Sequence, residues 1–238
     1  MIRRIGTAGW SIPAAERSAF PQDGSHLERY AAVFDAVEIN SSFYRPHRRT
    51  TYARWAASVG DDFRFSVKLP RSVSHADAGD VDEGDVERFA GEIAGLGGKL
   101  GVVLVQFPPS RVFCADHASA LFDTLRRHFP CPLACEPRHA SWFGDDAETL
   151  LTRFRIARVG ADPPRADGAD VPAGWPKLRY RRLHGSPRAY YSSYGPAALR
   201  ALHCAIDAEP DDTDLWCIFD NTALGAATAN ALELAAFR

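Results

Sequence analysis

The stretch "LGVVLVQF" (residues 100–107) is a short apolar run rich in β-branched valine, a pattern typical of a strand buried in a sheet. Similar apolar runs recur along the whole chain. They are "RRIGTAGW" (3–10), "AVEIN" (36–40), "FRFSVKL" (63–69), "LACEPRH" (133–139), "RIARVGAD" (155–162), "LRYRRLHG" (178–185) and "LWCIFDN" (215–221). Together with the first run, these segments predict eight strands.

Segments with helical periodicity lie between most of the predicted strands. They span 26–34, 50–59, 85–96, 116–128, 146–154, 196–206 and 224–236. Alternating strands and helices imply a parallel sheet, and eight such units in 238 residues predict a TIM-type (β/α)8 barrel. A stretch rich in Pro, Gly and Asp (161–177) predicts a long loop in place of the sixth helix. Because the alternation resumes after this loop, we predict a single barrel domain over residues 1–238.

A doubly wound open sheet is the competing architecture. Such a sheet usually carries a GxGxxG turn after its first strand, because that turn binds the phosphates of a dinucleotide. Here "GTAGWS" (6–11) supplies only Gly6 and Gly9. The sequence therefore favours the barrel, and it contains no nucleotide-cofactor motif.

Composition and charge exclude some classes of function. The formal net charge of −2 does not favour binding to nucleic acid through bulk charge. We see no apolar run long enough to span a bilayer and no secretory signal, so we expect no membrane partner. Five cysteines at irregular spacing, without a CxxC pair, indicate reduced thiols in a cytoplasmic protein.

Polar side chains stand where the predicted strands end. Active sites of such barrels lie at the C-terminal ends of the strands, so these side chains are expected to meet in one pocket. We predict catalytic roles for Glu38, Lys68, Glu136 and His184. We predict substrate contacts for Asn40, Tyr44, Gln106, Arg138, His139, Trp142, Arg182, Asp220 and Asn221.

The spacing of these residues supports convergence. Residues two apart on a strand share a face, as Glu38 and Asn40 do, and likewise Glu136 and Arg138, and Arg182 and His184. A buried carboxylate requires a partner. We therefore expect Glu38 to bind a cationic side chain from another strand, with Lys68 of the next strand as the favoured partner.

Structural roles compete with these functional ones. The two glutamates could belong to an ion network that only stabilises the fold, and Asp220 and Asn221 could cap the last helix. The aromatic residues Trp10, Tyr44 and Trp142 could simply pack in the core. The basic and aromatic segment "RPHRRTTYARW" (45–55) is most simply a solvated loop and helix face, although a stacking surface for bases or sugars stays open.

Several motifs in order resemble one family. They are "IGTAGWS" (5–11), "LERYAAVFDAVEINSSFYRP" (27–46), "FRFSVKLPRSVSH" (63–75), "LGVVLVQFPPS" (100–110), "CEPRHASW" (135–142), "YRRLHG" (180–185) and "FDNTALGAATANA" (219–231). By these motifs the chain resembles the YecE-like family, catalogued as domain of unknown function 72. The resemblance implies a TIM-type barrel without an established reaction. The chain departs from many relatives at Pro137 and at Asp220, which adds a carboxylate to the barrel mouth.

Three hypotheses of function follow from the predicted site. The first is an enzyme acting on a small anionic or sugar-like substrate, gripped by Arg138 and Arg182, with Glu136 or Glu38 as general base and His184 as acid. The second is a metal-assisted phosphoesterase or nuclease. A divalent metal is less favoured because no HxH spacing occurs and histidine is not in excess at the strand ends. The third is a module that binds a nucleic acid or a metabolite without catalysis. The cofactor, if any, stays unknown.

Overall fold

The strands form a nearly closed β/α barrel in a computed structural model that describes residues 2–77 and 81–237. The strands are β1 (Ile2–Ala8), β2 (Ala36–Ile39), β3 (Arg64–Lys68), β4 (Leu100–Gln106), β5 (Leu133–Glu136), β6 (Ile156–Arg158), β7 (Gly160–Asp162), β8 (Ala173–Gly174), β9 (Leu178–Leu183) and β10 (Asp214–Phe219). Their order in the sheet is β7-β9-β10-β1-β2-β3-β4-β5-β6-β8. All paired strands are parallel except β6 and β8.

The barrel closes through the strand predicted at 155–162. This segment is divided at Val159 into β6, which pairs with β5, and β7, which pairs with β9. The parallel strands therefore run in order from β7 to β6, which belong to one continuous segment, with the short antiparallel strand β8 added beside β6. The predicted TIM-type barrel is confirmed. The predicted loop is also confirmed, because no helix lies between β7 and β9; the two-residue strand β8 lies there instead.

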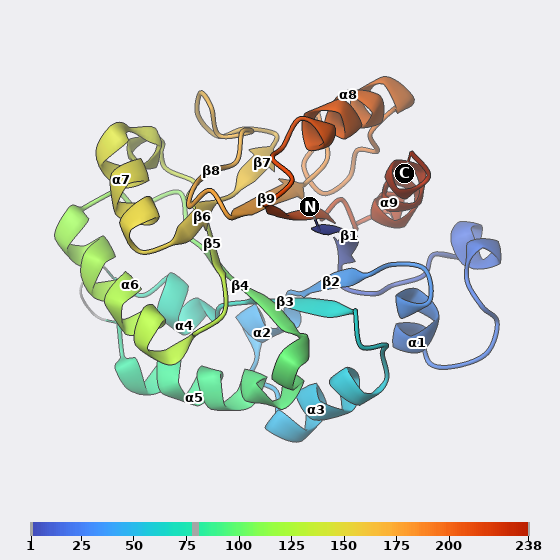
Figure 1. Ribbon diagram of the computed structural model, residues 1–238, viewed down its shortest axis with the longest axis horizontal. Helices are drawn as coiled ribbons and strands as arrows, with labels where there is room; N and C mark the ends of the chain where they lie inside the picture. The colour runs from blue at the N-terminus through green and yellow to red at the C-terminus, as the bar shows by residue number, and fades with distance from the viewer. Residues whose placement is uncertain (1, 78–80, 238) are drawn as a thin grey trace.

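Helices surround the strands on the outside (Figure 1). The α-helices are α1 (His26–Ala31), α2 (Ser41–Tyr44), α3 (Arg49–Ala57), α4 (Arg71–Ser74), α5 (Glu83–Ile93), α6 (Ala115–His128), α7 (Asp145–Arg153), α8 (Pro196–Asp207) and α9 (Ala226–Ala235). Short 3-10 helices are η1 (Ala14–Ala19), η2 (Ala94–Lys99) and η3 (Ala140–Phe143). Each predicted helix is present with ends shifted by a few residues. The sequence did not predict η1, η3, α2 and α4, which are too short to show periodicity. Within the described ranges, no helix is long and apolar enough to cross a membrane.

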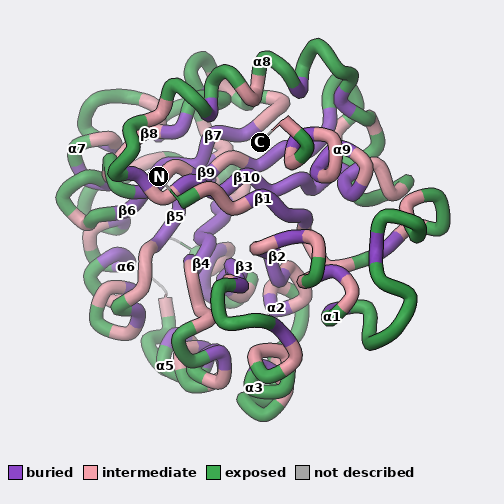
Figure 2. The backbone as a smooth tube through the Cα atoms, turned by 45° about the vertical axis from the view of Figure 1, so that its right-hand side comes forward, coloured by how far each residue is buried: buried purple, intermediate pink, exposed green. Residues whose placement is uncertain are grey.

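The apolar run of β4 explains how both faces of the sheet are buried. Val103 and Val105 pack outward against the helices, whereas Val102 and Leu104 fill the barrel interior. Most strand residues are buried, whereas the outer helices keep exposed faces (Figure 2). This two-sided burial is characteristic of parallel sheets and produces continuous apolar runs rather than alternation with polar residues.

Several strands are shorter than predicted at their C-terminal ends. The predicted strand 133–139 ends at Glu136, directly before Pro137, which has no N–H to donate to a ladder. The predicted strands 178–185 and 215–221 end at Leu183 and Phe219. The polar residues that follow therefore lie on the loops of the barrel mouth.

Candidate functional site

Alternation along the strands sends a set of polar side chains into the barrel mouth. On β2, β3, β4, β5, β9 and β10 the even-numbered residues face the interior, as the inner apolar cluster shows. Near the C-terminal ends of these strands, the even-numbered positions are Glu38, Lys68, Gln106, Glu136, Arg182 and Asp220. All six are buried. The structure thus brings together six of the predicted site residues in one layer.

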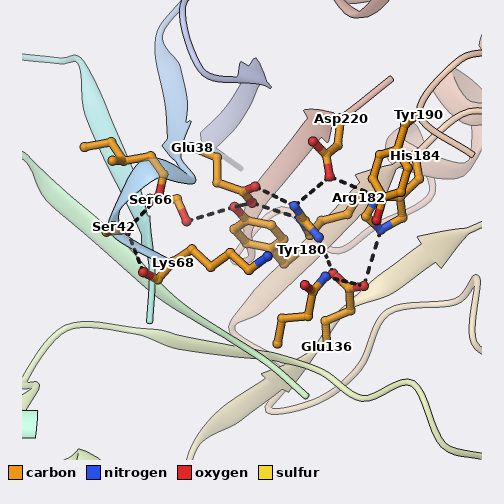
Figure 3. A network of polar contacts seen from close by, with 12 residues as sticks. Glu38, Ser42, Ser66, Lys68, Glu136, Tyr180, Arg182, His184, Tyr190 and Asp220 are labelled. Atoms are coloured by element: carbon orange, nitrogen blue, oxygen red, sulfur yellow. Dashed lines mark hydrogen bonds and ion pairs between the residues drawn. The ribbon is translucent and has the colours of Figure 1, made fainter. Parts of the chain in front are cut away.

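Arg182 is the centre of this layer (Figure 3). Its Nη2 and Nε lie 2.7 Å and 3.0 Å from the two carboxylate oxygens of Glu38. Its Nη1 donates to Glu136 at 2.5 Å, and Nη2 also donates to Asp220 at 2.9 Å. The guanidinium is completely buried, and each of its three nitrogens donates to a protein carboxylate. A ligand would therefore compete with these carboxylates for Arg182.

Glu38 has a different partner from the one predicted. The sequence favoured Lys68, but the carboxylate binds Arg182 of β9 and accepts a hydrogen bond of 2.8 Å from the Tyr180 hydroxyl. The prediction failed because closing the barrel brings β9 across the interior from β2, where a planar guanidinium matches a carboxylate with two parallel bonds. The same Tyr180 oxygen lies 2.8 Å from Ser66 Oγ, so Glu38 is linked to β9 directly and to β3 through Tyr180.

His184 lies between two carboxylates. Its Nδ1 is 3.0 Å from Asp220 and its Nε2 is 3.3 Å from Glu136. Burial lowers the pKa of His184, but the charge of Glu136 and the hydrogen bonds to both carboxylates outweigh it and raise the pKa above its usual range. Burial likewise raises the pKa of Glu136, yet Arg182 and His184 hold that pKa well below normal. These shifts favour the protonated form of His184 and the ionised form of Glu136.

Arg138 extends the cluster toward solvent. Its Nε donates to Glu136 at 3.1 Å, as the two-residue spacing predicted, and its Nη2 donates to the Tyr190 hydroxyl at 3.2 Å. Tyr190 also packs its ring edge-on to His184, with centroids 5.5 Å apart. Its backbone has a left-handed φ of 71°, which is unfavourable for a tyrosine and costs about 1–3 kcal/mol. Sequence reasoning missed Tyr190, because its position depends on the path of the loop after β9.

Lys68 stands apart from these ion pairs. Its side chain is 7% exposed and its Nζ lies 4.2 Å from the centre of the Phe43 ring. Among residues 2–77 and 81–237, no hydrogen-bond acceptor or carboxylate pairs with this amine. Burial and the charge of Arg182 lower the pKa of Lys68 to about 8, against the opposing effect of the three carboxylates.

A second group of cations surrounds His75, which sequence reasoning did not select. Burial and the charges of Lys68, Arg71, Arg138 and Arg111 lower the pKa of His75 to about 4. The His75 ring meets Phe43 edge-on with centroids 5.0 Å apart, which links it to Lys68. We call the four side chains around His75, namely Lys68, Arg71, Arg111 and Arg138, the cationic rim. The only signal in the sequence was the motif "KLPRSVSH" (68–75), where basic residues follow a strand end.

A pocket leads from solvent to the cluster. Its volume is about 340 Å³, part of it open to solvent, and its polar lining comes from Glu136, Arg138, Arg165, His184 and Tyr190. Arg165 lies on the long loop after β7 and is exposed. The imidazole–carboxylate pair and two guanidinium groups therefore line this pocket, while Glu136 and His184 themselves stay almost completely buried.

Other predicted site residues lie outside the cluster. Tyr44 ends α2 with 80% of its surface exposed, and Trp142 is buried against Phe107, Phe113 and Phe122. His139 caps η3 by accepting from the backbone N–H of Ser141. Asn221 is buried and donates to Ser192 and Asn230, which fixes the loop before α9. Asn40 follows β2 and lines a separate shallow pocket beside Trp10, with a buried Oδ1 that accepts no hydrogen bond from the described residues.

The donor set does not resemble a metal centre. Over the described residues, no group of three or more His, Cys, Asp or Glu side chains is arranged to hold a metal ion. The three mouth carboxylates instead share the positive charge of Arg182.

The fold and the side chains at the barrel mouth define this molecule as a TIM-type barrel protein with a buried ion cluster at the C-terminal ends of its strands. The family model described as "Protein of unknown function DUF72" matches residues 4–237. The chain belongs to this family, as the resemblance of its motifs predicted. It is 30% identical over 151 residues to the UPF0759 protein YecE of Escherichia coli K12, with 61% of this chain and 53% of that protein aligned. The UPF0759 protein YunF of Bacillus subtilis is 26% identical over 145 residues, with 58% and 51% aligned.

The matched segment spans about half the length of these curated relatives. Solved structures of the family match the whole chain. A DUF72 family protein from Enterococcus faecalis superposes with a TM-score of 0.82 at 22% identity, covering 98% of this chain and 94% of that one. A DUF72 family protein from Thermotoga maritima gives a TM-score of 0.78 at 25% identity, covering 100% and 99%. These likenesses show a shared fold.

Proposed function

We propose that the barrel mouth binds a small anionic or sugar-like molecule and processes it by acid–base chemistry. The observation that carries this proposal is the unpaired amine of Lys68 within the cationic rim. A largely buried cation without a direct ion-pair partner is costly, because the nearby carboxylates offset only part of the lost hydration. An anion bound between Lys68 and Arg138 would offset that cost, whereas Arg182 already has its carboxylates.

Proton transfer would fall to the pair of Glu136 and His184. Both line the pocket, and they lie 3.3 Å apart. The raised pKa of His184 keeps it protonated as a general acid, while the lowered pKa of Glu136 keeps it ionised as a base. Asp220 accepts from Nδ1 and orients the ring so that Nε2 faces Glu136 and the pocket. In many active sites the surroundings shift the pKa values of two neighbouring groups apart, so that one serves as the acid and the other as the base, and His184 and Glu136 follow this pattern.

Isothermal titration calorimetry with inorganic phosphate, glyoxylate and gluconate tests the binding step. We expect at least one of these anions to bind, with an affinity that falls at higher ionic strength because charges attract it. Arg138→Met should weaken binding by about tenfold or more, since charge-assisted hydrogen bonds contribute about 1.5–3 kcal/mol. Arg200→Met, on the exposed face of α8, is the matched control and should bind as the wild type does. Equal binding by both variants would exclude this site.

Turnover distinguishes an enzyme from a binding module. Proton NMR of each bound anion over hours would reveal conversion, and Glu136→Gln should abolish it while retaining the shape of the side chain. Stoichiometric binding without conversion, equal in wild type and Glu136→Gln, would instead support a binding module. If the affinity for single-stranded nucleic acid falls steeply as the salt concentration rises, and the affinity for the small anions does not, a polynucleotide partner is favoured.

A further inference from the structure

Lys68 has the geometry of a nucleophile rather than that of an ion-pair partner. It extends from the end of β3 toward Arg182 and Glu136 without a hydrogen bond to either (Figure 3). Within residues 2–77 and 81–237 its Nζ has no hydrogen-bond acceptor, and the atom keeps some surface toward solvent. One face of the amine rests on the Phe43 ring. The lone pair of the neutral amine is therefore not occupied by another group of the described chain.

The other lysines of the chain are engaged. The sequence contains three lysines among 28 basic residues, so lysine is the exception where arginine is usual. Lys99 Nζ donates to the backbone oxygens of Ala56 at 2.9 Å and Val59 at 2.6 Å. Lys177 forms an ion pair with Asp212 on the surface. Lys68 alone combines a buried stem, a cationic neighbour and a free amine among the described residues.

We propose that Lys68 is a catalytic nucleophile whose amine forms an imine with the carbonyl carbon of a small oxo acid. This inference rests on the proposed anion site, because the acid group of the oxo acid would be held by the cationic rim. A guanidinium could hold the same anion, but it cannot form an imine at neutral pH. The substrate class is thus narrowed to an anion that carries an aldehyde or ketone group.

The reaction is balanced without an oxidant or reductant. The neutral amine attacks the carbonyl carbon, a C–N bond forms, and the C=O π electrons move to oxygen. One proton passes from nitrogen to that oxygen, which gives a carbinolamine. A second proton converts the hydroxyl into water, which leaves as the nitrogen lone pair forms the C=N bond. The protonated His184 and ionised Glu136 supply the donor and acceptor for these proton movements.

The surroundings of Lys68 favour attack near neutral pH. Burial and the charge of Arg182 bring its pKa to about 8, so about a tenth of the amine is neutral at pH 7. An ordinary lysine is neutral in a fraction roughly two hundredfold smaller. Lowering a lysine pKa by burial and by a cationic neighbour is a recognised way to activate it for imine formation.

Reductive trapping on the intact chain tests the proposal. The protein is incubated with glyoxylate and sodium cyanoborohydride, digested, and mapped by mass spectrometry. An imine would be reduced to a carboxymethyl-lysine, and the three lysines fall in different peptides. We expect at least about tenfold more modification on Lys68 than on Lys177, with the rate rising as the pH passes about 8. Lys68→Arg should lose this product and leave labelling of Lys177 unchanged.

Calorimetry with inorganic phosphate, which has no carbonyl group, separates this proposal from the anion site. Phosphate binding together with trapping on Lys68 supports both. Phosphate binding without trapping, or labelling of Lys68 no greater than that of Lys177, overturns the imine and leaves the anion site standing. Trapping on Lys68 without phosphate binding supports Lys68 as the nucleophile and overturns the proposal that the cationic rim holds the acid group. If phosphate does not bind and Lys68 is not trapped, both the anion site and the imine are overturned.

Discussion

Arg182 on β9 binds Glu38 on β2 through two hydrogen bonds of 2.7 Å and 3.0 Å across the barrel mouth. Neither side chain is exposed to solvent by more than 1%. The pair spans strands that are 144 residues apart in the sequence. Glu136 and Asp220 bind the same guanidinium, so three carboxylates depend on one cation.

Arg182→Met should strongly destabilise the fold. Removing the cation leaves three buried carboxylates without their shared partner, and breaking a buried ion pair from one side costs about 3–5 kcal/mol. Urea unfolding at neutral pH measures this loss. Lys177→Met is the control: this residue lies directly before β9 and pairs with Asp212, where both side chains are more than half exposed and about 1 kcal/mol or less is expected. Similar losses in the two variants would contradict the central role of Arg182.

The Arg182→Met variant should also recover stability in acid. Without the guanidinium, burial raises the pKa of the carboxylates in the folded state, so protonation stabilises the fold as the pH falls. The difference in unfolding free energy between wild type and variant should therefore shrink from about pH 8 to about pH 5. A difference that stays constant with pH would mean that these carboxylates find other partners.

Much of this arrangement follows from the sequence alone. Alternation and strand–helix order predicted the barrel, and two-residue spacing correctly placed Glu136 with Arg138. The predicted partner of Glu38 was wrong. Adjacency along the chain favours Lys68, whereas closure of the barrel brings Arg182 opposite Glu38. Sequence distance carries no information about which residues meet across a closed sheet.

Loop residues were the least predictable part of the site. His75 and Tyr190 reach the mouth only through α4 and through a left-handed turn after β9. Tyr44 and Trp142 follow strands just as the mouth residues do, yet the short helices α2 and η3 turn one to solvent and the other into the core. Such short helices have too few residues to produce a periodic pattern.

His184→Gln should reveal the charge of the imidazole through its pH dependence. The pKa of His184 is raised in the folded state, so its contribution to stability is fully present below the unfolded pKa of about 6.5. That contribution is lost as the pH rises through the folded-state pKa. The stability difference between wild type and variant should thus be larger at about pH 6 than at about pH 9. His203→Gln, at an exposed pair on α8, should show little change at either pH. A difference that grows with pH would disprove a raised pKa.

Phosphate should raise the pKa of His75. Burial and the surrounding cations hold that pKa at about 4, and an anion in the rim would cancel part of their repulsion. NMR titration of the His75 ring with and without phosphate measures the shift. Arg71→Met should raise the pKa in the same direction without any anion. The exposed His117 on α6 serves as a reference in the same spectra. An unchanged His75 midpoint with phosphate present would place the anion elsewhere.

The Tyr180 hydroxyl connects Glu38 to Ser66 within the barrel interior. A carboxylate only accepts, so the Tyr180 O–H donates to Glu38 and leaves the Ser66 hydroxyl to donate to the Tyr180 oxygen. Tyr180→Phe should cost about 1–3 kcal/mol, because the buried carboxylate loses a donor while the ring still stacks on Trp216.

Ser66→Ala removes the second bond of this chain and should cost about 1 kcal/mol. In the Tyr180→Phe background the hydrogen bond between Ser66 and Tyr180 is already lost, so Ser66→Ala removes less there. The cost of the double variant should therefore fall below the sum of the two single costs by about 0.5 kcal/mol or more. Urea unfolding of the four proteins in the cycle measures this coupling. Strict additivity would show that the two hydroxyls act independently, and the connection from β3 through β9 to the ion cluster would then contribute nothing to its stability.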